Sequence, residues 1–334
     1  MGLKLGMADE GLHPTGAASN WNESRYVDFW DRTQRIGGWF RIGNRPNEGH
    51  GEVSACLYLP DGSVAFWFER AAIRENTLSS GGQSWEILEP WHRSRVRFRG
   101  EMLVLPDCWQ LKDPKQSFTS APRAPADIEL DVETLGLDAV MGSDQDHIDR
   151  IFVPGQADCH YQHLARVRGT VRLGDRHWTV DGHGGKDHSW GPRNWHAKIY
   201  LRWIICAFDD ANGFMLVRAV GPTRQTRGGF VLEDGRFHLV DTFELRNQYA
   251  GPPHFELQRM NVKMHCGGRT LEATATPQAF VPLRHRKTGR DGNPVLLRMV
   301  KSPLEWVDGA GRPGVGHTEI QDTLIDGVPC GIGD

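Results

Sequence analysis

The densest group of chemically reactive side chains lies in the stretch Gly182–Trp195, which places acidic, imidazole, guanidinium and indole groups on a glycine-rich backbone. Gly184–Gly185 allows the chain either to turn sharply or to approach a neighbouring segment closely. Asp187 follows these glycines and precedes Trp190 and Trp195. Because apolar surroundings disfavour the charged form of a carboxyl group, they raise its pKa. The stretch therefore predicts a proton donor at Asp187; the alternative is a glycine-rich turn with packed tryptophans.

The sequence contains no recognisable motif for phosphate binding or for a lipase-type serine nucleophile. A phosphate-binding loop would need Gly-x-x-x-x-Gly-Lys followed by Ser or Thr, and a serine hydrolase of the lipase type would need Gly-x-Ser-x-Gly; neither pattern occurs. His160, His163, His183 and His188 could gather around a metal, but no facial pair of histidines with a carboxylate can be read. We therefore expect no metal and no cofactor, which leaves proton transfer among Asp, Glu, His and Tyr.

The composition favours an all-β globular protein. The chain has 334 residues, of which 39% are hydrophobic and 24% charged, and its net charge is −3. A nucleic-acid partner would need a concentrated basic face, which this balance does not provide. The 39 glycines and 19 prolines imply many turns and short elements. The 12 tryptophans either pack in a core or line a cavity for a bulky apolar ligand.

The cysteines and the N-terminus favour a cytoplasmic protein. The six cysteines are scattered without zinc-finger spacing, as expected in a reducing compartment. Residues 1–20 lack the apolar run of a signal peptide, and we expect them to form a disordered or loose tail. Because no run of about 18 apolar residues exists, we expect no membrane span. A homodimer is left open.

Alternating patterns predict the strands that position the reactive residues. Val53, Ala55, Leu57 and Leu59 alternate with other side chains, and Pro60–Gly62 then marks a hairpin turn. Similar strand–turn–strand units recur to the end of the chain. They predict an antiparallel, meandering, all-β architecture.

Two segments depart from this pattern. Tyr26, Phe29 and Trp30 are close to helical spacing, so residues 22–35 allow a short helix or turn. Residues 112–158 contain clustered prolines and acidic residues, and we expect a long loop or a lid there.

The length and the hairpins in both halves predict two barrels or sandwiches. The first is expected over residues 21–215, including the loop 112–158, and the second over residues 216–334.

The motifs resemble those of one known group of proteins. Asp187–Arg193, preceded by Gly182–Gly185, resembles the signature of the AttH-like and carotenoid-hydratase-like superfamily. Arg41–Asn47, His160–Gln162 and Gly316–Glu319 resemble other landmarks of that superfamily in the same order. The resemblance implies two consecutive lipocalin-like (calycin-type) β-barrels, with a ligand cavity at their junction or in the first barrel. It also implies cofactor-free chemistry on terpenoid, isoflavonoid or polyketide molecules.

The resemblance also implies roles for individual side chains. The expected catalytic residues are Asp187, Glu319, His160, Tyr161 and His188, and the expected substrate-binding residues are Arg41, Trp190, Arg193 and Trp195. In this scheme Asp187 protonates an alkene or a departing hydroxyl group, and Glu319 or His160 is the complementary base. Structural alternatives stay open, since Asp187 could pair with Arg193, and Glu319 could lie on an exposed edge.

Two classes of function follow from this reading. The first is an enzyme, a lyase, hydratase, isomerase or cyclase that acts by general acid–base catalysis on a bulky hydrophobic terpenoid, polyketide or phenolic molecule. The second is a carrier that only binds such a molecule. Grouped carboxylates and imidazoles favour the enzyme, because unpaired buried ionisable groups are unfavourable in a plain apolar carrier.

Overall fold

The computed structural model describes residues 4–136, 140–288 and 294–333. The first of its two antiparallel sheets contains β1 (Trp21–Asp31), β2 (Ile36–Arg45), β3 (His50–Tyr58), β4 (Val64–Ala72), β5 (Ser79–Ser80), β6 (Gln83–Glu89), β7 (Arg93–Leu105), β8 (Arg123–Thr134), β9 (Cys159–Leu173) and β10 (Arg176–Pro192). The strand order is β4-β3-β2-β1-β10-β9-β8-β7-β6-β5, and a further pairing of β4 with β7 closes the sheet into a barrel.

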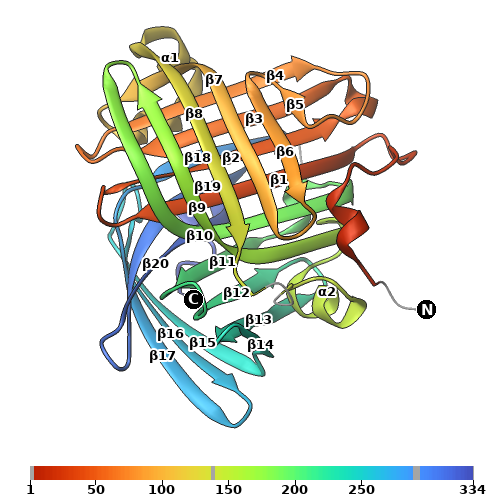
Figure 1. The fold of residues 1–334 in the computed structure, drawn as a ribbon, viewed down its shortest axis with the longest axis vertical. Helices are drawn as coiled ribbons and strands as arrows, with labels where there is room; N and C mark the ends of the chain where they lie inside the picture. The colour runs from red at the N-terminus through yellow and green to blue at the C-terminus, as the bar shows by residue number, and fades with distance from the viewer. Residues whose placement is uncertain (1–3, 137–139, 289–293, 334) are drawn as a thin grey trace.

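The second sheet curves below the first in Figure 1 as a half-barrel. It contains β11 (Tyr200–Ala207), β12 (Gly213–Val220), β13 (Gln225–Glu233), β14 (Arg236–Leu239), β15 (Thr242–Tyr249), β16 (Leu257–Cys266), β17 (Arg269–Pro277), β18 (Val281–Thr288), β19 (Pro294–Asp308), β20 (Pro313–Ile325) and β21 (Val328–Pro329). Its main path runs β14-β13-β12-β11-β20-β19-β17-β16-β15, with β18 paired to β19 and β21 to β20.

Short helices connect the strands. They are the 3-10 helices η1 (Met7–Glu10), η2 (Pro46–Glu48), η3 (Cys108–Lys112) and η4 (Trp195–Ala197) and the α-helices α1 (Pro114–Ser120) and α2 (Gln145–Ile151). Within the described part of the chain, each helix is too short and too polar to cross a bilayer.

Alternate residues of β1 belong to two different cores. Val27 and Phe29 point into the barrel, where they join an apolar cluster that includes Ile128 of β8. Tyr26 and Trp30 point the other way and join a cluster between the two sheets. Since successive strand residues face opposite sides, a strand that is buried on both sides shows no apolar–polar alternation. The expected helix or turn over residues 22–35 is therefore wrong, and the segment forms strand β1 and the start of the turn that follows it.

The predicted all-β class with two antiparallel units is confirmed. By hydrogen-bond pairing, the chain passes from the first sheet to the second between Pro192 and Tyr200. The expected division at residues 215/216 falls later, inside β12. The turn before it connects β11 to β12 in an antiparallel hairpin.

Two expected irregular segments contain more structure than predicted. Residues 112–158 include α1, β8 and α2, and residues 137–139 of this segment lie outside the described residues. In the expected tail, Glu10 is buried and accepts a hydrogen bond from the Tyr161 hydroxyl at 2.7 Å. Polar contacts, which hydropathy does not reveal, hold this N-terminal segment against the barrel.

Candidate functional site

A cavity of about 310 Å³ lies between the two sheets, a volume typical of small-molecule sites. On the barrel side, the strand register places Ser54, Arg41, Tyr26, Asp187 and Gln162 in one row across β3, β2, β1, β10 and β9. Residues directly opposite each other on neighbouring strands share one face of the sheet. The whole row therefore lines the cavity.

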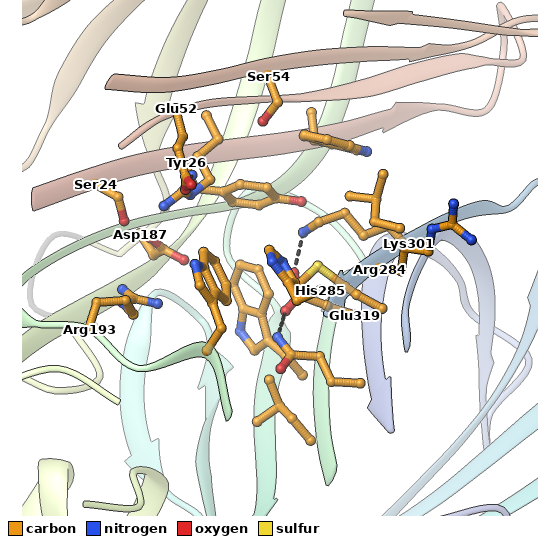
Figure 2. A pocket seen from close by; sticks show the side chains of 18 of the residues that line it. Ser24, Tyr26, Glu52, Ser54, Asp187, Arg193, Arg284, His285, Lys301 and Glu319 are labelled. Carbon is orange, nitrogen blue, oxygen red and sulfur yellow. Dashed lines mark hydrogen bonds and ion pairs between the residues drawn. The ribbon is translucent and has the colours of Figure 1, made fainter. Parts of the chain in front are cut away.

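The second sheet supplies the facing wall. Val217, Trp203, Glu319 and Lys301 form a row across β12, β11, β20 and β19, and Phe118 of α1 adds to the apolar lining. The cavity thus combines aromatic surface with acidic and basic groups. Figure 2 shows Asp187 and Arg193 at one side of it, with Lys301 and Glu319 at another.

Asp187 and His160 contact each other at the wall of this cavity. Nε2 of His160 lies 3.5 Å from Oδ2 of Asp187, and the Phe152 ring stacks on the imidazole with a centroid distance of 4.4 Å. Burial lowers the pKa of His160 below its ordinary value of 6.5. Its imidazole is therefore uncharged at neutral pH and can accept a proton. The expected indole neighbour of Asp187, Trp190, is absent from the residues that line the cavity.

Glu319 forms a buried ion pair with Lys301. The Gln321 amide donates a hydrogen bond to the other carboxylate oxygen, and Nζ of Lys301 lies 4.2 Å from the centroid of the Tyr26 ring. Burial would raise the pKa of Glu319, but Lys301 and Gln321 lower it to about 2. Such a carboxylate is a weak base. Of the two expected bases, His160 fits the role better, and Glu319 fits a role in orienting Lys301.

Trp195 contacts two guanidinium groups. The Cζ atoms of Arg41 and Arg193 are 5.2 and 5.4 Å from the centroid of the Trp195 ring. The His285 ring stacks on the same indole at 4.4 Å. All four side chains line the cavity, so the substrate-binding positions expected for Arg41, Arg193 and Trp195 agree with this geometry.

The other three expected site residues, Tyr161, His188 and Trp190, do not reach this cavity. They lie on the opposite faces of β9 and β10, towards one end of the barrel interior, where Trp190 stacks on His13 at 3.7 Å. Asp187 and His188 point to opposite faces because β10 is a continuous strand there. The expectation that His188, Tyr161 and Trp190 join Asp187 in one site is therefore wrong for this geometry.

Two of these residues, Tyr161 and His188, belong to an inner polar cluster made of Glu10, His13, Glu23, Tyr161 and His188. His188 contacts Glu23 through Nε2 at 2.8 Å and the Tyr161 hydroxyl through Nδ1 at 3.2 Å. Ligand atoms of His13, Glu23 and His188 lie within 4.8 Å of one another, a spacing that a metal ion could use. The same atoms already contact one another through hydrogen bonds. The expectation that no metal is bound stays a prediction.

The glycines before Asp187 serve close packing and not a turn. A Cβ atom on Gly184 would overlap the Asp28 carbonyl oxygen of β1, and one on Gly185 would lie 2.5 Å from Ile205 of β11. Side chains at these positions would separate β10 from β1 and from the second sheet. The glycines therefore allow the close packing that holds Asp187 in its place between the sheets.

Several cavity residues were not singled out from the sequence. They include Tyr26, Trp39, Lys198, Trp203 and Lys301. Lys301 had a partial signal, since it is a charged residue within the largely apolar strand β19. The aromatic residues had none, because tryptophan and tyrosine are equally common in cores.

Solved structures with the same fold include proteins of the expected superfamily. A protein proposed to be AttH from Nitrosomonas europaea has a TM-score of 0.55 and 14% identity, with 92% of this chain and 94% of that chain covered. CghA with Sch210972 has a TM-score of 0.55 and 10% identity, with 98% and 96% covered. Kievitone hydratase from Nectria haematococca has a TM-score of 0.51 and 8% identity, with 93% of each chain covered. The resemblance to AttH-like proteins is confirmed at the level of the fold.

Sequence comparisons place the chain in a family without an assigned activity. No curated protein matches the chain significantly. One family model matches residues 6–324, and its description reads "domain of unknown function (DUF7064)". That match spans both sheets and every residue of the cavity described above. The chain therefore belongs to the DUF7064 family.

Proposed function

We propose that this protein is an enzyme that acts by proton transfer on a bulky hydrophobic small molecule bound between its two sheets. The reaction class is that of a lyase, hydratase, isomerase or cyclase without a cofactor. The observation that carries this proposal is the contact between Asp187 and His160 at the cavity wall. A carboxyl group beside a neutral imidazole can give a proton to one substrate atom and remove a proton from another.

The second wall supports the same chemistry. The Lys301 ammonium group lies on the aromatic faces of Tyr26 and Trp39 and pairs with Glu319. A fixed cation of this kind stabilises negative charge that develops on a substrate oxygen in the transition state. The aromatic lining would bind the apolar body of the substrate.

The relatives of known fold point the same way. One is named kievitone hydratase, and CghA was crystallised with the small molecule Sch210972. Because their identity to this chain is low, these relatives support a class of reaction and of ligand and no particular substrate.

The test begins with the small molecule that co-purifies with the protein, extracted and identified by mass spectrometry. We expect wild-type protein to convert this molecule or its immediate precursor. Asp187→Asn should bind it with unchanged affinity and lose conversion by at least about 100-fold. Asp181→Asn is the matched control, because Asp181 lies on the same strand, exposed and paired with Arg166. Binding without conversion by the wild type would show a carrier, and conversion by Asp187→Asn at the wild-type rate would remove Asp187 from the mechanism.

A further inference from the structure

The structure assigns an anion-binding subsite to one end of the cavity, formed by Arg41, Arg193 and Lys198 around Trp195. We infer that the substrate is an aromatic molecule that carries an anionic oxygen group, such as a carboxylate. This inference rests on the proposed function in one respect, namely that the cavity is the substrate site. It adds a substrate class and an orientation that neither the fold nor the family assigns.

The three cations are poorly neutralised by the protein. Nη1 of Arg41 is 3.6 Å from a Glu52 oxygen, while Nη2 of Arg41 is buried without a hydrogen-bond partner among the described residues. Arg193 donates a hydrogen bond to the uncharged Ser189 hydroxyl. Lys198 is buried, and no hydrogen bond or ion pair of its ammonium group occurs within residues 4–136, 140–288 and 294–333.

A fourth donor at this end also lacks an acceptor. Nε1 of Trp195 is buried and has no hydrogen-bond partner in the described part of the chain. Unsatisfied buried donors are rare in folded proteins, and each one is unfavourable by itself. Arg41 and Trp195, which both line this end of the cavity, thus each carry a buried donor without an acceptor among the described residues.

The pKa values of Arg193 and Lys198 are lowered, as expected for buried cations that repel one another. Burial and the neighbouring Arg41 lower the pKa of Arg193 to about 10. Burial and the neighbouring Arg193 lower the pKa of Lys198 to about 8. Both shifts mean that the surroundings disfavour the positive charge. An anionic ligand would relieve this repulsion, since it favours the charged form of each group.

The charges of the whole cavity agree with an anionic ligand. Six cationic side chains line it, Arg41, Arg70, Arg193, Lys198, Arg284 and Lys301, against the three carboxylates of Glu52, Asp187 and Glu319. Two of these carboxylates already contact cations, since Glu52 is near Arg41 and Glu319 pairs with Lys301. Burial lowers the pKa of His285 to about 4, so this imidazole adds no positive charge at neutral pH.

The apolar lining defines the rest of the ligand. Trp39, Phe66, Phe118, Phe152 and Trp203 also line the cavity, and flat rings of this kind favour an aromatic or otherwise planar ligand body. An anionic group held by Arg193 and Lys198 would place that body along the row that contains Asp187 and Tyr26. Figure 2 shows Arg193 next to Asp187 at this end of the cavity.

The test compares two probes of nearly equal shape, the anion 2-naphthoate and the neutral 2-naphthamide, by isothermal titration calorimetry on the full chain. We expect wild-type protein to bind 2-naphthoate at least about tenfold more tightly than 2-naphthamide. Lys198→Met and Arg193→Met should each abolish this preference and leave 2-naphthamide binding within about twofold. Lys198→Arg should retain the preference. Lys263→Met is the control for net charge, since Lys263 is half-exposed on β16, outside the cavity lining.

Thermal unfolding without ligand provides a second readout. Because removal of an unpaired buried cation relieves repulsion, Lys198→Met should unfold at the same or a higher temperature than the wild type. A lower unfolding temperature together with loss of both probes would show a structural role for Lys198 and overturn the proposal. Equal affinity for the two probes, or binding of neither, would also overturn it. Failure of the proposed function would instead appear as absent turnover with the charge preference intact.

Discussion

His160 and Asp187 lie diagonally across the β9–β10 ladder, with His160 opposite Ser189 and Asp187 opposite Gln162. Their side chains therefore share one face of the barrel, and Nε2 of His160 lies 3.5 Å from Oδ2 of Asp187. Diagonal neighbours in a sheet are within reach of long or ring-bearing side chains. This arrangement holds a carboxyl group and an imidazole on two rigid strands, which suits proton transfer better than placement on loops.

The base role of His160 predicts a specific pH profile. A base must be unprotonated, and burial lowers the pKa of His160 below 6.5. We expect kcat/KM to be independent of pH on the acid side until the pH falls below about 6.5, and then to decline. His160→Gln should lower kcat by about 100-fold or more and abolish this acidic limb. The measurement is the pH–rate profile of both proteins with the co-purifying molecule; an unchanged limb in the variant would assign the ionisation to another group.

The ion pair between Lys301 and Glu319 predicts that a single substitution lowers the free energy of unfolding more than the double substitution does. Lys301→Met leaves the Glu319 carboxylate buried without its cation and should destabilise the fold by about 3–5 kcal/mol. Lys301→Met combined with Glu319→Gln should recover most of this loss, because no charge is then left unpaired. Chemical denaturation of the four proteins gives the coupling free energy. Additive effects of the two substitutions would show that the pair is not coupled.

The same pair predicts that the free energy of unfolding depends on pH in the acidic range. The folded pKa of Glu319 is about 2, below its ordinary value of 4.5. A depressed carboxylate pKa stabilises the fold fully above pH 4.5, and this contribution is lost as the pH falls towards about 2. Glu319→Gln should therefore show a shallower loss of stability over this range. Urea midpoints measured between pH 5 and 3 check the slope, and parallel slopes for variant and wild type would contradict the assignment.

The burial of His188 in the inner polar cluster predicts a second pH dependence of stability, at higher pH than that of Glu319. Burial and the nearby Arg25 lower its pKa from 6.5 to about 4. The unfolded chain then binds a proton more readily than the folded chain, so stability is lost as the pH falls from 6.5 towards 4. His188→Gln should flatten this part of the curve, whereas His92→Gln at an exposed turn should not. Thermal unfolding followed by circular dichroism at each pH makes the comparison, and equal slopes would contradict it.

The sequence predicted the fold class and part of the cavity for identifiable reasons. Polar turns and alternating strands revealed the hairpins, and the motif around Asp187 led to a residue that lines the cavity, as did those around His160 and Arg41. The motif did not separate Asp187 from His188, because only a continuous strand reveals that adjacent residues point apart. Gly184 and Gly185 allowed either a sharp turn or a close approach to a neighbouring segment, and Gly184 accommodates the backbone of β1.

The remaining site residues depend on contacts that are distant in the sequence. Lys301 and Tyr26 meet only because the second sheet packs on the barrel, with 4.2 Å between Nζ and the ring centroid. Lys198 lies in the connection between the sheets, and its burial follows from that packing. No local period or spacing encodes such contacts, so a single sequence does not reveal them.

Two glycines give the last prediction, because an added methyl group should reduce stability at Gly184 and leave it nearly unchanged at Gly43. At Gly184 the methyl group would overlap the Asp28 carbonyl oxygen, which belongs to the backbone and cannot move away. Gly184→Ala should therefore separate β1 from β10 and destabilise the protein by about 1–3 kcal/mol or more. At Gly43 the methyl group would lie 2.5 Å from Nη2 of Arg41, the movable end of a flexible side chain.

Gly43→Ala should accordingly leave the unfolding temperature nearly unchanged while it displaces the Arg41 guanidinium from the face of Trp195. Its effect on ligand affinity should match that of Arg41→Met. Thermal unfolding and calorimetric titration of the three variants test both statements together. An equal loss of stability at Gly43 and Gly184 would show that the fold tolerates a side chain at neither position. Unchanged ligand affinity in Gly43→Ala would show that ligand binding does not depend on the position of the Arg41 guanidinium beside Trp195.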